Sequence, residues 1–217
     1  MSKVIDLTLP LYHGCPGMPL DPKCAVIVHH TIDSMKYNMT QLSLSTHQGT
    51  HLDAPYHFFN DGKTVDKLDL SKCAGPAEII DLPGLKPKYN LTIKDIKPFE
   101  ERITQSSRII LRTGWWRKFP AKEYFFDGPM ISPQLAQWFA RKKIAMLGLE
   151  TPGVHSVEWE KVHKILLKAE IVIIEGLAYL NKIKKDKVFF VAAPLKIKGR
   201  DGSPVRAIAI ENVNLLK

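Results

Sequence analysis

The chain has 217 residues, which fits one domain at about 100–200 residues per domain, so we expect residues 1–217 to form a single domain. Hydrophobic residues make up 45% of the chain and charged residues 24%, a balance that excludes disordered, collagen-like and disulfide-scaffold proteins. The 31 Lys and Arg residues exceed the 22 Asp and Glu residues and leave a net charge of +9. This excess keeps a basic nucleic-acid-binding module open as a rival class.

The three cysteines, Cys15, Cys24 and Cys73, are odd in number and widely spaced, so they build neither a disulfide framework nor a paired zinc knuckle. A reducing compartment, the cytoplasm, is therefore the expected location. Near the N-terminus, Asp6 lies where a secretory signal needs an unbroken apolar run, and no stretch reaches about 18 apolar residues. We expect neither export by this route nor a membrane-spanning segment.

The predicted elements mix strands and helices. An irregular loop rich in Gly and Pro, residues 10–22, follows the first expected strand and is typical of loops that bind or cover something. The expected strands are 4–9, 40–46, 77–82, 108–113, 143–149, 171–174, 188–193 and 205–210, and the expected helices are 133–142 and 157–168. Each helix leads directly into a hydrophobic strand, which predicts mixed α/β layers.

Residues 40–46 alternate between polar and apolar side chains, so Leu42 and Leu44 are expected to face the core. If the extended conformation continues beyond residue 46, four odd-numbered polar residues project from the opposite face: His47, His51, Asp53 and His57. A helix would also suit the spacing of the first two histidines. Gly49 and Pro55 disfavour that alternative because both are poor residues for a helix interior.

Three of the 8 histidines fall within residues 47–57. Two imidazoles and a carboxylate within seven residues offer the mixed nitrogen and oxygen donors that suit Zn²⁺, Mn²⁺ or Fe²⁺, and three protein ligands leave room for a reactive water. The alternative is a set of surface histidines on a loop. The clustering of the four polar residues favours the metal site.

A second pair of residues has the character of metal ligands. His163 lies within the apolar stripe of the expected helix 157–168, which consists of Trp159, Val162, Leu166 and Leu167, so its imidazole is expected to point inward. Glu175 ends a buried strand, and a buried carboxylate is costly unless it is paired or bound to metal. A hydrogen-bonded core histidine and a solvent-facing glutamate are the alternative. His155 ranks lower as a ligand because it follows Pro152 and Gly153 in a loop.

The segment 47–58, His-Gln-Gly-Thr-His-Leu-Asp-Ala-Pro-Tyr-His-Phe, resembles the signature H-x-G-T-H-x-D-x-P-x-H-F of the cyclase family of metal-dependent hydrolases. This family includes bacterial kynurenine formamidases and isatin hydrolases. The resemblance extends over most of the chain and includes Arg112–Trp115, Glu175–Leu177 and Pro204–Ala207. It implies a swivelling β/β/α fold, a homodimer, and one or two zinc or manganese ions per subunit.

Carried over residue by residue, the resemblance assigns roles to the polar cluster. It implies that His47, His51 and Asp53 bind the first ion and that Asp53, His163 and Glu175 bind a second. His57 matches the histidine that acts as general acid and base. Two further residues, Phe58 and Trp115, are candidates to contact an aromatic substrate, although aromatic residues also form ordinary core.

The expected function is metal-dependent hydrolysis of an amide, formamide or cyclic amide, such as the hydrolysis of N-formylkynurenine in tryptophan catabolism. An isatin-type cyclic amide hydrolase is the alternative within the family, and a metal-binding protein without activity is a third possibility. Two segments depart from dedicated kynurenine formamidases. Residues 150–156 replace an acidic D-T-P-S-x-D segment, and residues 16–22 lack a tryptophan that is common there. Both changes concern substrate recognition, and neither touches the metal ligands.

Overall fold

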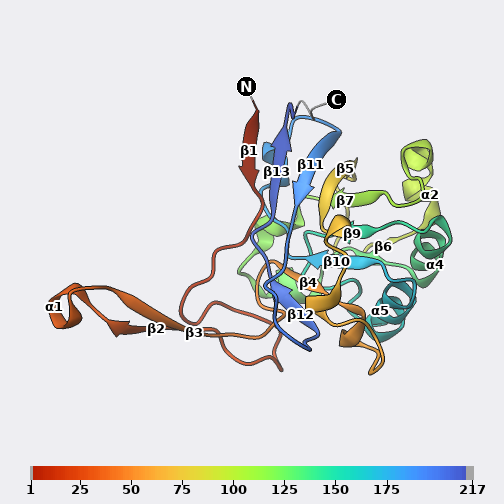
Figure 1. Cartoon of the computed structure of the whole chain (residues 1–217). Coiled ribbons are helices and arrows are strands. Elements are labelled where there is room, and N and C mark those ends of the chain that lie inside the picture. The colour runs from red at the N-terminus through yellow and green to blue at the C-terminus, as the bar shows by residue number, and fades with distance from the viewer. Residues whose placement is uncertain (1, 214–217) are drawn as a thin grey trace.

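The structure is a computed structural model that describes residues 2–213. Its centre is a nine-stranded sheet with the strand order β1–β13–β11–β5–β7–β9–β10–β4–β12 (Figure 1). These strands are β1 (Lys3–Asp6), β4 (His51–Asp53), β5 (Ala74–Asp81), β7 (Arg108–Arg112), β9 (Met146–Gly148), β10 (Val172–Glu175), β11 (Lys187–Val191), β12 (Gly202–Pro204) and β13 (Ile208–Glu211). Two short strands, β6 (Asn90–Leu91) and β8 (Met130–Ile131), pair in a separate sheet.

The four middle strands, β5, β7, β9 and β10, are parallel, and the strands that flank them are antiparallel. The α-helices are α1 (Ile32–Met35), α2 (Ile93–Ile96), α3 (Lys122–Phe126), α4 (Pro133–Lys142) and α5 (Trp159–Lys168).

α4 has the bounds that the sequence predicts, because Ser132 caps its first turn and Lys143 ends it in a left-handed conformation. α5 begins two residues later than predicted, and Trp159 is 51% exposed instead of facing the core.

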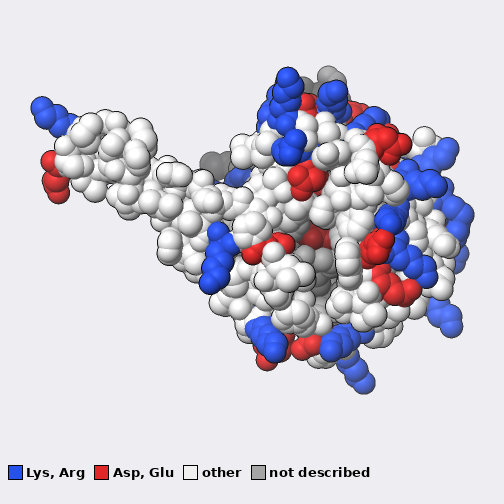
Figure 2. Space-filling view, turned by 90° about the horizontal axis from the view of Figure 1, so that it is seen from below, with Lys and Arg blue, Asp and Glu red and all other residues white. Residues whose placement is uncertain are grey.

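A two-stranded arm projects from the body of the molecule (Figures 1 and 2). It consists of β2 (Ala25–His30), α1 and β3 (Met39–Ser43), and among the described strands β3 pairs only with β2. The prediction that Leu42 faces the core is therefore wrong, since its side chain is 59% exposed, and Leu44 is only partly buried. Polar and apolar side chains do alternate in this segment, but the body of the described chain does not pack against the apolar side chains of the arm.

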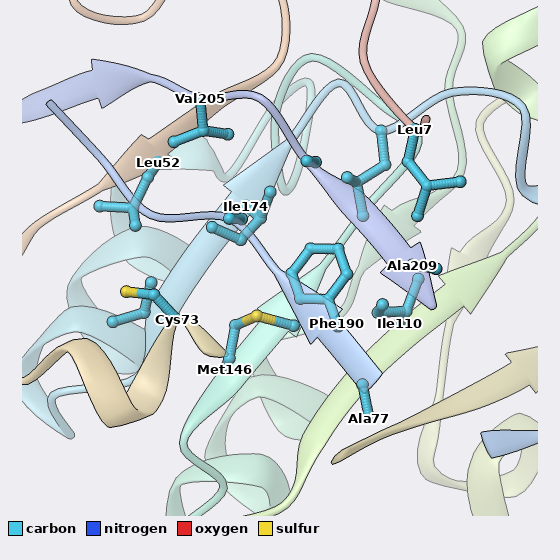
Figure 3. Close-up of a cluster of buried hydrophobic side chains, with 14 of the residues drawn as sticks. Leu7, Leu52, Cys73, Ala77, Ile110, Met146, Ile174, Phe190, Val205 and Ala209 are labelled. Carbon is cyan, nitrogen blue, oxygen red and sulfur yellow. The ribbon is translucent and has the colours of Figure 1, made fainter. Parts of the chain in front are cut away.

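Both faces of the parallel strands are buried, and successive side chains enter different cores. Ile109 and Leu111 of β7 face α4 and α5, while Ile110 faces the opposite side. There it packs with side chains of the flanking strands, including Phe190 and Ala209, because the sheet curls over its own second face (Figure 3). The result is two β layers and one α layer. No helix of the described chain is both long enough and apolar enough to cross a membrane.

Candidate metal centre

The short strand β4 brings two of the predicted ligands to one face of the sheet. In its antiparallel pairing with β10, His51 lies opposite Glu175, and Leu52 lies opposite Ile174. Because side chains alternate along a strand, His51, Asp53 and Glu175 share the face that α5 covers. Leu52 points into the other core. The register of one strand pair therefore gathers an imidazole and two carboxylates.

Helix α5 supplies the fourth group to this face. His163 is buried in its inner side, and its Nε2 lies 3.5 Å from Asp53 Oδ2 and 3.4 Å from Glu175 Oε1. On the other side of the two carboxylates, Nε2 of His51 lies 3.5 Å from Asp53 Oδ1 and 3.3 Å from Glu175 Oε2. These separations are longer than the 2.7–2.9 Å typical of a charge-assisted hydrogen bond. Two imidazoles and two carboxylates thus converge without close pairing.

In His51 and His163, the ring nitrogen that points away from the carboxylates, Nδ1, is held by a backbone carbonyl. His51 Nδ1 donates to the carbonyl of Gly49 at 3.0 Å, and His163 Nδ1 donates to the carbonyl of Trp159 at 2.7 Å. A carbonyl only accepts, so each Nδ1 carries the proton and each Nε2 presents a lone pair in the neutral tautomer. This is the support that metal-binding histidines commonly have. The two nitrogens that face the carboxylates are therefore available as ligands.

Two carboxylate oxygens in this cluster, Asp53 Oδ2 and Glu175 Oε1, are buried without a hydrogen-bond partner among residues 2–213. Burial alone would raise the pKa of Asp53, but the surrounding histidines, His47 first, hold the pKa of its carboxyl well below its usual value. Each of these carboxylates therefore buries one oxygen that has no partner, and such burial is costly unless a cation neutralises the charge. The donor atoms present therefore fit a divalent metal ion that prefers mixed nitrogen and oxygen ligands.

His47 lies in the turn that precedes β4, between two carboxylates. Its Nδ1 is 2.8 Å from Asp53 Oδ1, and its Nε2 is 2.6 Å from Asp201 Oδ2. Burial acts to lower the pKa of His47, but the two carboxylates outweigh it and raise that pKa to about 10. A protonated His47 and a bound cation are alternative sources of the positive charge that this acidic cluster requires.

Asp201 was not among the residues that the sequence singled out. It lies in the turn between β11 and β12, far from the motif in sequence, and also accepts a hydrogen bond from Thr46 Oγ1 at 2.8 Å. Gly202, which follows Asp201, is the sequence feature that could have indicated this contact. A Cβ on Gly202 would lie 2.6 Å from the carbonyl of Leu52 and 2.9 Å from the ring of His47. Gly202 therefore allows this turn to approach the motif closely.

His57 reaches the cluster from a short 3-10 turn, Pro55–His57, and not from an extended strand. The expected continuous strand is broken on both sides of β4, by a turn at Gly49 with φ of +65° and by Pro55. The His57 ring stacks on His47 with their centroids 4.0 Å apart. Burial lowers the pKa of His57 to about 4, although the carboxylate of Asp53 acts in the opposite direction. The ring is therefore neutral near pH 7.

A cavity of about 600 Å³ opens beside these residues. Phe58 lines it and stacks on His163, with ring centroids 4.7 Å apart. Trp115 is buried beside the cavity and is not among its lining residues. Its Nε1 donates to the carbonyl of Tyr124 at 3.2 Å, and Tyr124 is part of the lining. His155 lines the cavity as well, but its Nδ1 already accepts hydrogen bonds from the backbone N–H groups of Val157 and Glu158.

Comparison with known proteins agrees with this geometry. The model of a family described as "Putative cyclase" matches residues 5–156. The kynurenine formamidase of Bacillus anthracis is 32% identical over 210 residues, which cover 95% of this chain and 97% of that protein. The chain belongs to this cyclase family. The kynurenine formamidase of Geobacillus thermodenitrificans is also 32% identical to this cyclase-family chain, over 213 residues and with the same coverage.

Solved structures extend the likeness to the fold. An isatin hydrolase bound to the product analogue thioisatinate has a TM-score of 0.86 at 26% identity, covering 96% of this chain and 92% of that one. A potential metal-dependent hydrolase with cyclase activity has a TM-score of 0.83 at 27% identity, covering 98% of this chain and all of that one. The α/β fold with the β/β/α layers of the cyclase family is thereby confirmed.

Proposed function

We propose that this cyclase-family protein is a metal-dependent hydrolase of carbon–nitrogen bonds other than peptide bonds, acting on aryl formamides and related amides. The observation that carries the proposal is the convergence of His51, Asp53, His163 and Glu175 beside an aromatic-lined cavity, in a chain that is 32% identical to kynurenine formamidases over nearly its full length. Amide hydrolysis requires activation of a water and of the substrate carbonyl, and this arrangement fits both needs.

The predicted ligands would hold one or two ions of zinc or manganese, with His47, His51 and Asp53 at the first position and Asp53, His163 and Glu175 at the second. When bound, such a cation supplies Lewis acidity, which lowers the pKa of water and polarises a carbonyl. The carbonyls of Gly49 and Trp159 hold two of the imidazoles in the orientation that the ligands need.

His57 would perform the proton transfers. Its ring is neutral near pH 7, so it can accept a proton from the attacking water and return it to the departing nitrogen. Its stacking on His47 fixes the plane of the ring beside the ligand cluster. Phe58 would contact the aromatic ring of the substrate, and Trp115 would support Tyr124 in the cavity wall from behind.

The test is a substrate panel. Purified protein reconstituted with Zn²⁺ or Mn²⁺ is assayed with N-formylkynurenine, isatin and a simple aryl ester, and bound metal is measured by elemental analysis. We expect metal-dependent release of formate from the formamide. Turnover of isatin alone would favour the second candidate, a cyclic amide hydrolase, for which the isatin hydrolase with a TM-score of 0.86 is the specific support. Absence of turnover and of bound metal would contradict the proposal.

We further propose a homodimer that forms through the arm. The arm, residues 25–43, exposes apolar side chains along both strands and at its tip, including Val28, Ile32 and Met35. Its charged side chains, Asp33 and Lys36, lie only at the outer end (Figure 2). A two-stranded hairpin is marginal on its own in water, so a second copy of the chain is the expected cover.

The remaining expectations about surroundings are also proposals. The three cysteines are free and buried, which suits the cytoplasm. The partner is a small molecule, and no nucleic acid is expected. A gel-shift titration at increasing salt tests the second statement, because true phosphate contacts give an affinity that falls steeply with ionic strength.

A further inference from the structure

The lining of the cavity indicates which substrates this hydrolase selects. We propose that the protein prefers uncharged aryl amides and discriminates against substrates that carry a free carboxylate group away from the scissile bond. This inference rests on the proposed function, since it concerns the substrate class of the same site. It follows from the charges, the hydrogen bonds and the apolar surface of the cavity.

The charges of the lining are acidic. Although the chain has 31 Lys and Arg residues, none of those in the described part of the chain lines the cavity. The charged lining residues apart from histidines are Asp21 in the N-terminal loop and Glu175 at the ligand cluster, and Asp53 lies next to the latter. A metal ion at Glu175 and Asp53 would neutralise these two carboxylates. A remote carboxylate would still lose its hydration in the cavity and would meet Asp21, with no Lys or Arg of the described chain in the lining to pair with it.

The histidines of the lining do not replace the missing cation. His155 accepts hydrogen bonds at Nδ1 from the backbone N–H groups of Val157 at 3.0 Å and Glu158 at 2.9 Å. A nitrogen that accepts carries no proton, so this imidazole is neutral. His47 lies between two carboxylates, which already balance any charge on its ring. Among the lining histidines of the described chain, His155 is the one that belongs neither to the proposed metal ligands nor to the proposed acid/base, and it offers no positive charge to a substrate.

Much of the cavity wall is formed by aromatic side chains. Phe58, Phe125, Phe126 and Trp159 line it, and its volume of about 600 Å³ exceeds what a single aromatic ring fills. At the mouth the side chain of Leu20 is 99% exposed. A fully exposed leucine beside an aromatic wall gains by contact with an apolar substituent.

Two loops line the cavity away from the ligand cluster. Residues 18–21 belong to the first loop, and Thr151, Pro152, Gly153, His155 and Ser156 belong to the second. A Cβ added at Gly153 would meet no atom of the described chain within 4 Å, so this part of the cavity has room for a substituent. We therefore expect the part of the substrate beyond its reacting bond to lie against these two loops.

A matched pair of substrates isolates the charge. In 4-(2-formamidophenyl)-4-oxobutanoic acid and its methyl ester, the formamide, the ring and the ketone are the same, and only the remote carboxylate differs. We expect the ester to have a kcat/KM about tenfold higher than the acid. Equal values, or a preference for the acid, would overturn the inference. N-formylkynurenine is a less clean probe because its ammonium group can pair with Asp21.

Binding of the deformylated products to metal-free protein gives a second measurement that does not depend on turnover. The aminophenyl ketones are fluorescent, so their Kd values can be titrated directly, and without metal the acid cannot bind as a ligand of the ion. We expect tighter binding of the ester. If neither formamide is hydrolysed, the proposed function fails, whereas the ratio of the two Kd values still decides the inference.

A variant places a cation at the mouth. Leu20→Lys changes a fully exposed side chain, and we expect it to reduce the ester preference about fivefold through attraction of the carboxylate. The matched control is Leu70→Lys, which makes the same change at a 57% exposed leucine that does not line the cavity. The control should retain the wild-type ratio. If the ester preference falls equally in both variants, it depends on the net charge of the protein and not on the lining of the cavity, and the inference is overturned.

Discussion

At the residue scale, both ring nitrogens of each candidate histidine ligand have a polar neighbour. His51 and His163 each place one nitrogen on a backbone carbonyl and direct the other to the carboxylates. His47 differs because Asp201, a side chain, holds its outer nitrogen. A carboxylate raises the basicity of the imidazole that it contacts, so Asp201 is expected to strengthen the ligand and to fix its ring.

We predict that Asp201→Asn weakens metal binding about 10–100-fold, since residues that support metal ligands have effects of this size. The measurement is a competition titration with a chromophoric chelator. Asp61→Asn, at an exposed aspartate, is the control and should bind metal as the wild type does. Unchanged affinity in Asp201→Asn would show that His47 does not depend on this contact.

Local sequence predicted the candidate ligands because most of them lie in one short motif with a strong resemblance to a known family. Asp201 could not be predicted in this way, since it meets His47 only after the turn before β12 folds against β4. The alternation argument was correct for His51 and Asp53, which lie in a strand. It did not apply to His47 and His57, which lie in turns and converge with the others through tertiary structure.

At the scale of elements, the pairing of β4 with β10 fixes the site, and the turns at the ends of these strands must pack closely. Gly176 follows the last residue of β10 with φ of +68°, and a Cβ there would lie 2.5 Å from the carbonyl of Gly49. Both turns adjoin residues of the ligand cluster, Glu175 and His51. A change at this glycine therefore acts on the geometry of both strands.

We predict that Gly176→Ala lowers the free energy of unfolding by at least about 3 kcal/mol, because it adds a steric clash to the cost of a left-handed alanine. Gly199→Ala is the matched control, since Gly199 has φ of +71° and open space around it. The control should lose only about 1 kcal/mol. Urea denaturation measures both values, and equal losses would contradict the close approach of the two turns.

The elements themselves were predicted unevenly, for physical reasons. The bounds of α4 follow from its own cap residues, so they could be read locally. The strand at residues 40–46 exists in part as β3, but its burial was predicted wrongly, because alternation indicates that a face will be covered and does not say by what. β12 and the arm partner β2 were not predicted as strands. β12 has only three residues, Gly-Ser-Pro, and no apolar pattern, whereas β2 contains a β-branched run, Val-Ile-Val, that does indicate a strand.

At the scale of the whole molecule, the arm is the feature that a single chain leaves unexplained. We predict that replacing Val28 and Ile32 together with Lys shifts the protein from dimer to monomer, because charges on the apolar arm oppose its burial. Light scattering coupled to size-exclusion chromatography measures the mass. Leu70→Lys is the control for an exposed leucine outside the arm and should remain dimeric. A wild-type protein of 24.6 kDa in solution would contradict the proposed dimer.

The central claim is that hydrolysis by this protein depends on a divalent ion held by the motif and by α5 and β10. The most direct measurement is the rate of formate release from an aryl formamide by chelator-treated protein, before and after addition of Zn²⁺ or Mn²⁺, with Asp53→Asn beside the wild type. We predict that metal removal abolishes turnover, that metal addition restores it in the wild type, and that Asp53→Asn neither retains metal nor recovers. Full activity of the metal-free protein, or of the variant, would contradict the account.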